Sequence, residues 1–270
     1  MRVVISGGAG FVGSSLARLF RAHDPSTEVF AFDNLRRRGS ELNLPDFKRE
    51  GIQFIHGDVR VPSDLDAIPG TFDLFIEASA EPSVHAGISD GLRYVLDTNL
   101  SGTLNCLEYA RKKAAALVFL STSRVYSIPL LRSLHLEEHS TRFVLSVNGE
   151  QTIGLSADGI AEDFPSVGQG YRSFYGSTKL ASELFVEEYA QNFGYPAVIN
   201  RCGVLAGPGQ FGRTDQGVFT LWVARHVFGG KLSYTGFGGG GKQVRDILHP
   251  RDLYSLLMKQ LPLLKKHAGE

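Results

Sequence analysis

The chain has 270 residues, 43% of them hydrophobic, which is enough to bury the core of one large domain or of one domain and a lobe. Lysine plus arginine and aspartate plus glutamate each number 28, so the charge balance gives no reason to expect nucleic-acid binding. Two cysteines cannot build a disulfide framework, the eight histidines are scattered, and no metal residues are expected. Without a run of 18 apolar residues or a signal peptide ahead of the first strand, the sequence predicts a cytoplasmic protein that makes no membrane contact.

The first thirty-five residues combine a short apolar strand, a glycine cluster and a segment of helical periodicity. Gly7, Gly10 and Gly13 have a spacing that allows a tight turn, close approach of a pyrophosphate and close packing of the helix on the strand. The next apolar run ends at Asp33, where an acidic side chain accepts hydrogen bonds from an adenosine ribose and repels a 2′-phosphate. This pattern predicts NAD as the cofactor. The arginines at 36–38 keep NADP as an alternative, because arginine can accept a 2′-phosphate.

Apolar runs and helical segments alternate along most of the remaining chain. Runs at 52–59, 72–80, 116–123 and 196–204 are predicted strands, and 96–113 is one of the helical segments between them. This alternation predicts an α/β fold with a doubly wound parallel sheet of the Rossmann type. Ligands bind such sheets outside the carboxyl ends of the strands. The residues at or near those ends are Asp58, Ala78, Ser79, Ala80, Asn99 and Thr122.

Tyr175 and Lys179 stand four residues apart at the start of a predicted helix and so share one of its faces. A cation beside a phenol favours the phenolate, which would lower the tyrosine pKa toward neutral and make Tyr175 a usable general base. The alternative is a surface pair on an amphipathic helix. The buried face of that helix would be Leu180, Leu184, Phe185 and Tyr189.

Five motifs in order along the chain, GGAGFVG, GDVR, STSRVYS, YGSTK and KQVRDILH, resemble the extended short-chain dehydrogenase/reductase family of nucleotide-sugar epimerases and dehydratases. The resemblance implies that Thr122, Tyr175 and Lys179 act together at a bound nicotinamide. Tyr175 would take a proton from a sugar hydroxyl while hydride passes to the nicotinamide. Lys179 would hold the nicotinamide ribose, and Thr122 would hydrogen-bond the reacting oxygen. The resemblance therefore favours an active site over a surface pair.

The glycine pattern, the strand ends and the resemblance together define the residues expected at the site. Cofactor binding is expected at Gly7, Gly10, Phe11, Val12, Gly13, Asp33, Asn34, Asp58, Val59, Ala78, Ser79, Ala80, Asn99, Tyr175, Lys179 and Cys202. Substrate binding is expected at Glu81, Ser83, Thr122, Ser123, Arg213, Gln216 and Arg245.

The resemblance also separates the reactions within the family. Sugar-nucleotide 4,6-dehydratases carry an acid and a base where this chain has Ser123 and Arg124, so elimination of water lacks its proton carriers. Residues 209–219 and 240–253 resemble the branch of CDP-sugar 2-epimerases. That branch implies oxidation at C2 of a CDP-deoxyhexose by retained NAD and return of the hydride to the other face. A UDP-hexose 4-epimerase, a nucleotide-sugar reductase and an NAD-binding scaffold with an idle site are the alternatives.

Two side chains and the domain organisation complete the expectations. Arg245 would be the cation on the substrate diphosphate, with a salt bridge to Asp246 or Asp252 as the alternative. Glu77 stands where the family often has histidine, and the sequence offers no physical account of it. Residues 1–200 are expected to form the NAD-binding domain and 201–270 a nucleotide-sugar lobe that lacks part of the family's C-terminal region. A homodimer is expected through helices that flank the sheet, including the one that begins at Tyr175.

Overall fold

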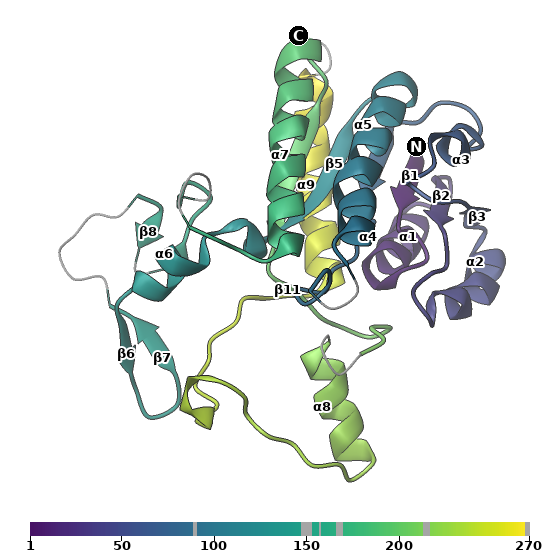
Figure 1. Ribbon diagram of the computed structural model, residues 1–270. Helices are drawn as coiled ribbons and strands as arrows, with labels where there is room; N and C mark the ends of the chain where they lie inside the picture. The colour runs from purple at the N-terminus through teal and green to yellow at the C-terminus, as the bar shows by residue number, and fades with distance from the viewer. Residues whose placement is uncertain (89–90, 147–152, 157, 166–169, 213–216, 268–270) are drawn as a thin grey trace.

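The computed structural model describes residues 1–88, 91–146, 153–156, 158–165, 170–212 and 217–267. Its centre is a six-stranded parallel sheet in the order β10-β5-β4-β1-β2-β3 (Figure 1). The strands are β1 (Arg2–Ser6), β2 (Glu28–Asp33), β3 (Gln53–His56), β4 (Leu74–Glu77), β5 (Leu117–Thr122) and β10 (Ala197–Cys202). This confirms the doubly wound α/β fold predicted from the alternation of strands and helices.

Helices cover both faces of the sheet. Successive side chains of a strand point to opposite faces, so each face carries apolar side chains that pack against helices. Val3 and Ile5 of β1 belong to one core, with side chains of α1, α2 and α9, whereas Val4 belongs to a second core with α3, α5 and α7. These helices are α1 (Phe11–His23), α2 (Leu44–Glu50), α9 (Pro250–His267), α3 (Pro62–Asp66), α5 (Gly102–Lys113) and α7 (Phe174–Phe193). Burial on both faces explains why the strands are almost continuously apolar.

The strand order reverses beside β1, which creates the crevice where such sheets bind ligands. From β1 the chain adds β2 and β3 on one side, and β4, β5 and β10 on the other. Short helical segments border this crevice at the carboxyl ends of β2 and β4. They are η1 (Ser40–Asn43), α4 (Arg93–Leu96) and the π-helical turn η2 (Asp97–Ser101), which leads directly into α5.

A second region lies beyond the sheet and comes from two separate stretches of the chain (Figure 1). The first contains η3 (Ser123–Val125), α6 (Ile128–Ser133), β6 (Leu136–Glu138), β7 (Phe143–Leu145), β8 (Leu155–Ser156) and β9 (Gly159–Ile160). The second contains β11 (Val204–Leu205), α8 (Val218–Val227), η4 (Phe237–Gly239) and β12 (Ile247–Leu248). Lys242 joins the two, because its Nζ lies 2.7 Å from an oxygen of Glu138.

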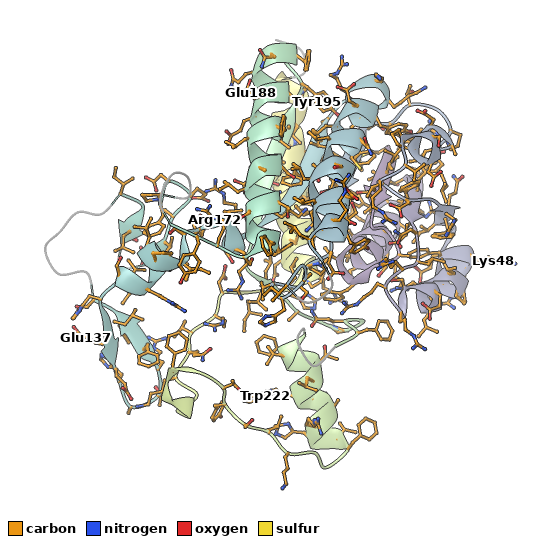
Figure 2. The ribbon with its side chains drawn as sticks, viewed as in Figure 1. Lys48, Glu137, Arg172, Glu188, Tyr195 and Trp222 are labelled. Carbon is orange, nitrogen blue, oxygen red and sulfur yellow. The ribbon has the colours of Figure 1, made fainter. Side chains whose placement is uncertain are left out.

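The outer part of this region lies well away from the sheet, as Glu137 of β6 and Trp222 of α8 show (Figure 2), whereas Leu205 of β11 and Leu248 of β12 pack against the core of the sheet. The domain boundary expected at residue 200 stays a prediction. In space, α6 and β6 to β9 lie in the second region, whereas α9 packs on the sheet through Leu253, Leu257 and other apolar side chains.

The buried face of α7 differs from the apolar stripe expected for an amphipathic surface helix. Leu184 and Phe185 are 45% and 43% exposed, whereas Lys179 is only 2% exposed. The expected stripe was right for Leu180, which is buried, but wrong for Leu184 and Phe185, because the inward face of α7 also borders the ligand crevice and is therefore partly polar. The buried residues of α7 are Gly176, Thr178, Lys179, Leu180, Ser182, Glu183 and Val186. Burial of Lys179 rules out a surface pair.

Within the described ranges, no helix is long and apolar enough to cross a membrane. His135 and His139 are four residues apart, but they flank β6 in a hairpin instead of sharing a helical face. In the same part of the chain, no group of three or more histidine, cysteine, aspartate or glutamate side chains could hold a metal ion.

Candidate active site

The loop between β1 and α1 approaches its neighbours so closely that only glycine fits. Gly7 has φ +63°, and a Cβ there would lie 2.8 Å from the carbonyl oxygen of Ala78. A Cβ on Gly13, in the first turn of α1, would lie 2.2 Å from the carbonyl oxygen of Gly7. The loop therefore places the N-terminus of α1 against the pocket, where its unpaired N–H groups favour a pyrophosphate.

Asp33, the last residue of β2, lies beside this glycine loop as predicted. Its carboxylate accepts hydrogen bonds from the backbone N–H groups of Ala9 (3.1 Å) and Leu35 (2.7 Å). Burial raises the pKa of Asp33, and these backbone bonds act in the opposite direction. The carboxylate is thus fixed at the pocket wall, where it fits an adenosine ribose.

The adenosine end of the pocket is bordered by Arg36, one of the arginines noted in the sequence, and by Tyr94, which the sequence did not single out. Arg36 lies over the ring of Tyr94, with its guanidinium carbon 4.0 Å from the ring centroid. This contact joins the loop after β2 to α4. Asp58 is behind this wall and accepts a hydrogen bond from Asn34 (2.9 Å). Burial raises the pKa of Asp58, but its bonds to Arg60 and Asn34 outweigh burial and lower it to about 2.

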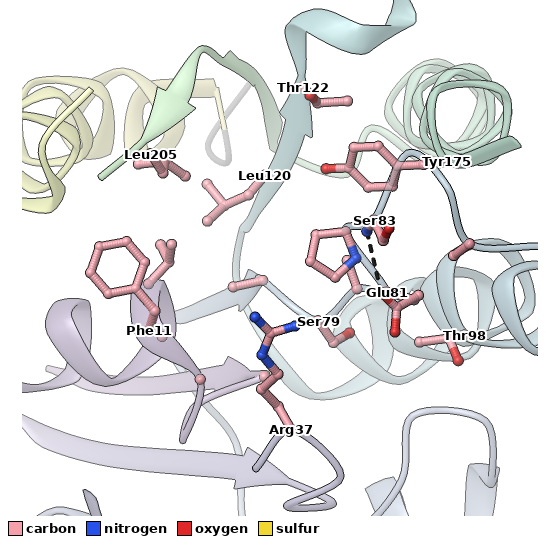
Figure 3. A pocket seen from close by; sticks show the side chains of 18 of the residues that line it. Phe11, Arg37, Ser79, Glu81, Ser83, Thr98, Leu120, Thr122, Tyr175 and Leu205 are labelled. Carbon is pink, nitrogen blue, oxygen red and sulfur yellow. Dashed lines mark hydrogen bonds between the residues drawn. The ribbon is translucent and has the colours of Figure 1, made fainter. Parts of the chain in front are cut away.

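Thr122 and Tyr175 are neighbours in the pocket, and the Tyr175 hydroxyl points toward Thr122 (Figure 3). Thr122 ends β5 and is 7% exposed, while Tyr175 is the second residue of α7. The N-terminus of α7 is held there by Ser173, whose hydroxyl oxygen accepts a hydrogen bond from the Gly176 N–H at 3.1 Å. Thr122 and Tyr175 are 53 positions apart in sequence (175 − 122), and packing of α7 against β5 brings them together.

Tyr175 does not have the lowered pKa that its spacing from Lys179 suggested. Burial of the phenol raises its pKa, while the Lys179 charge and a hydrogen bond with Thr122 lower it. Cys202 and Glu77 add to the rise, and the net pKa lies above the usual 10.0. The expected net fall was therefore wrong, because loss of hydration outweighs the neighbouring cation.

Lys179 is paired with a residue of another strand end. Its Nζ lies 3.3 Å from Oε2 of Glu77, and the two side chains are 2% and 1% exposed. The same Nζ is 4.4 Å from the ring centroid of Phe119. Glu77 ends β4, 102 positions from Lys179, so sequence spacing alone could not suggest this pair.

One pocket of about 1170 Å³ brings most of the predicted residues together. The cofactor residues that line it are Gly7, Gly10, Phe11, Val12, Gly13, Asp33, Asn34, Val59, Ala78, Ser79, Ala80, Tyr175 and Lys179. The substrate residues that line it are Glu81, Ser83, Thr122, Ser123 and Arg245. Arg213 and Gln216 lie outside the described residues.

Three of the expected cofactor residues, Asp58, Asn99 and Cys202, stand behind the pocket wall. Asn99 is fully buried, and its amide bonds both the N–H and the C=O of Glu81, at 2.7 and 3.1 Å. It therefore fixes the loop after β4, which carries Ser83 (Figure 3). Burial raises the pKa of Cys202 to about 11, so its thiol is neutral beside Tyr175.

At the opposite end, the pocket is bordered by two arginines. Arg124 and Arg245 both line it, and burial, followed by the charge of Arg124, lowers the pKa of Arg245. In the part of the chain that the structure describes, Arg245 forms no ion pair with Asp246 or Asp252, which removes the salt-bridge alternative. Its guanidinium instead donates to Oε1 of Gln243 at 2.6 Å. Two cations facing one cavity favour an anionic ligand there.

A loop from the second region reaches the cofactor side of the pocket. Arg37 points into the pocket and donates to the carbonyl oxygen of Phe211 at 3.2 Å (Figure 3). A Cβ on Gly39 would lie 2.8 Å from the Phe211 ring, so this ring packs directly on the loop after β2. Sequence reasoning missed Phe211, although it lies in the segment 209–219 whose resemblance to sugar epimerases was noted.

A parallel sheet in this strand order, with its pocket at the carboxyl ends of the strands, is the architecture of dinucleotide-binding enzymes. Residues 3–267 match the NAD dependent epimerase/dehydratase family, and the chain belongs to this family. The match confirms the family predicted from the motifs. Because the family is one of NAD-dependent enzymes, it also confirms the expected cofactor and an enzymatic role.

Individual relatives extend this result. The chain is 30% identical to the CDP-paratose 2-epimerase of Salmonella typhi, in an alignment that spans 100% of this chain and 77% of the relative. It is similar to a double mutant of dTDP-glucose 4,6-dehydratase from Streptomyces venezuelae, solved with NAD bound (26% identity, TM-score 0.74, 97% of this chain and 72% of the other). It is also similar to UDP-glucose 4-epimerase from Thermus thermophilus in complex with NAD (25%, TM-score 0.72, 97% and 74%). These relatives are epimerases and a dehydratase, so the particular reaction has to be argued from the site.

Proposed function

We propose that this protein is an NAD-retaining nucleotide-sugar epimerase that acts at C2 of a CDP-deoxyhexose. The observation that carries the proposal is that Thr122 and Tyr175 (Figure 3) share one pocket with the glycine loop and with the arginine pair Arg124 and Arg245. A dinucleotide on the glycine loop and a diphosphate at the arginines would both direct their reacting ends toward Tyr175. The similarity to CDP-paratose 2-epimerase supports the choice of carbon and nucleotide.

Each residue of the pocket would have its own role in this reaction. Bound NAD supplies the acceptor for a hydride and later its donor. Tyr175 takes the proton of the sugar hydroxyl at the carbon being oxidised and returns it when the ketone is reduced. Thr122 hydrogen-bonds the same oxygen, and Lys179 adds a positive charge that favours the phenolate. The ketone must turn over between the two hydride steps, which requires the open space of a large pocket.

A dehydratase reaction is disfavoured by two side chains of this pocket. Elimination of water needs an acid and a base beside the reacting carbons. The pocket offers Ser123 and Arg124 next to Thr122, and neither side chain is a carboxyl group that could serve as that acid or base.

The substrate assignment can be tested with labelled CDP-paratose that carries deuterium at C2. We expect conversion to CDP-tyvelose with the deuterium kept at C2, because the hydride leaves and returns on the same cofactor. UDP-glucose serves as the substrate for the 4-epimerase alternative. NMR of the products distinguishes these possibilities. Loss of label to water would exclude return of the same hydride, and turnover of UDP-glucose alone would exclude C2 of a CDP-sugar as the reacting carbon.

We also propose that the protein forms a homodimer through α7. Leu184, Phe185 and Phe193 of α7 are 45%, 43% and 55% exposed, an apolar set that favours burial against another chain. We predict that Leu184→Glu combined with Phe185→Glu converts a dimer to a monomer in sedimentation velocity. Phe228→Glu is the matched control, because Phe228 is 85% exposed but lies at the end of α8. A wild-type chain that sediments as a monomer would contradict this proposal.

A further inference from the structure

The carboxylate of Glu77 is buried at the base of the candidate active site. Glu77 is 0% exposed, and one of its oxygens lies 3.3 Å from Nζ of Lys179. Its other oxygen accepts a hydrogen bond from the hydroxyl of Ser79. Lys179 is equally enclosed, since Phe119 covers its Nζ from the β5 side. Two opposite charges are thus held together out of contact with water.

The groups around this pair contribute little charge near neutral pH. Burial raises the pKa of Cys106 on α5 well above its usual range, and Glu77 adds to the effect. Burial likewise raises the pKa of Cys202 on β10 to about 11, and the pKa of Tyr175 on α7 is raised too. Ser6 of β1, near Cys106, is uncharged. Near neutral pH, the charged groups of this cluster are therefore the ammonium of Lys179 and the carboxylate of Glu77.

We propose that Glu77 is a positioning residue: its carboxylate is the counter-ion that keeps Lys179 charged and in place behind Tyr175. The inference rests on the proposed function, because it concerns the cation that supports the general base. A buried ammonium without a partner is strongly disfavoured and becomes a neutral amine. Glu77 also opposes ionisation of Tyr175 directly. This cost is smaller than the benefit of a lysine that stays charged, so the pair as a whole favours catalysis.

Replacement of Glu77 tests the proposal through the pH profile of turnover. In Glu77→Gln, Lys179 should lose its charge at lower pH, so the alkaline limb of the kcat profile should move toward neutral pH. Turnover at pH 8 should fall by ~10-fold or more if the pKa of the unpaired lysine drops about one unit or more below that pH, because only a tenth or less of the chains then keep the charge. Glu77→Asp keeps the charge and should recover part of the wild-type profile. A Glu77→Gln enzyme with the wild-type profile and rate would overturn the proposal.

Glu183→Gln is a matched control on α7. The Glu183 side chain is 1% exposed and lies 2.8 Å from Nη2 of Arg201, and its carboxylate also accepts from the Ser121 hydroxyl. Since arginine does not lose its proton, this variant should melt at a lower temperature without a shift of the alkaline limb. If both variants shifted the profile equally, Glu77 would be a general structural residue and not a partner of Lys179.

A measurement that needs no substrate separates this inference from the proposed function. Glu77→Gln and Lys179→Met should each lower the melting temperature, and the double variant should melt above the less stable single variant, because no unpaired charge is left. Additive losses would contradict the pairing. Absence of turnover in the wild-type protein would instead count against the proposed function alone.

Discussion

Replacing Tyr175 by phenylalanine should reduce kcat by ~10²–10⁴-fold, the usual contribution of a positioned general base. The substitution removes the phenolic oxygen beside Thr122 and keeps the ring that fills this part of the pocket. Bound NAD and the melting temperature should therefore stay close to wild type. Because burial raises the pKa of Tyr175, wild-type turnover should increase with pH as the phenol ionises, and the variant should lose this dependence.

Tyr171→Phe is the matched control for this prediction. Tyr171 lies four residues earlier, is 58% exposed and contacts Arg132 through its hydroxyl, so its loss should leave kcat unchanged. Steady-state kinetics with the accepted nucleotide sugar measures both variants. Undiminished turnover in Tyr175→Phe would show that another group is the base.

Gly13→Ala should give a protein that purifies without NAD and unfolds more easily by ~1–3 kcal/mol, the range for overpacking a tight contact. The added Cβ would lie 2.2 Å from the carbonyl oxygen of Gly7, so the loop or α1 has to move. That movement displaces the N–H groups on which a pyrophosphate depends.

Gly240→Ala is the control for Gly13→Ala. Gly240 has φ −77°, and the nearest atom to its added Cβ would be Cγ of Lys242 at 3.9 Å. Urea unfolding and the NAD content of the purified proteins measure both effects. Gly13→Ala with full NAD content would contradict the role of the glycine loop.

The features that were predicted best from the sequence are those that depend on a short stretch of the chain. The spacing of Gly7, Gly10 and Gly13 and the acid Asp33 at the next strand end each depend on one βα unit, and all four residues line the pocket. The alternation of strands with helices likewise gave the parallel sheet.

Contacts between distant segments were not predictable in the same way. Glu77 pairs with Lys179 across 102 positions, and Arg37 contacts the carbonyl of Phe211 across 174. The direction of the Tyr175 pKa shift could not be predicted from helical spacing either. It is set by burial in the surrounding fold, whose desolvation of the phenol outweighs the charge of the neighbouring Lys179. The exposure of Leu184 has a similar origin, since the sheet and the site together decide which face of α7 is buried.

The central claim is that this chain retains NAD through each turnover, and its most direct test is the cofactor content of the purified protein. The protein would be denatured, and the released nucleotides identified and quantified by chromatography. We predict close to one NAD per chain and no NADP, in line with the fixed carboxylate of Asp33. A protein that carries NADP, or that carries no nicotinamide cofactor and needs added NAD for each turnover, would contradict the account.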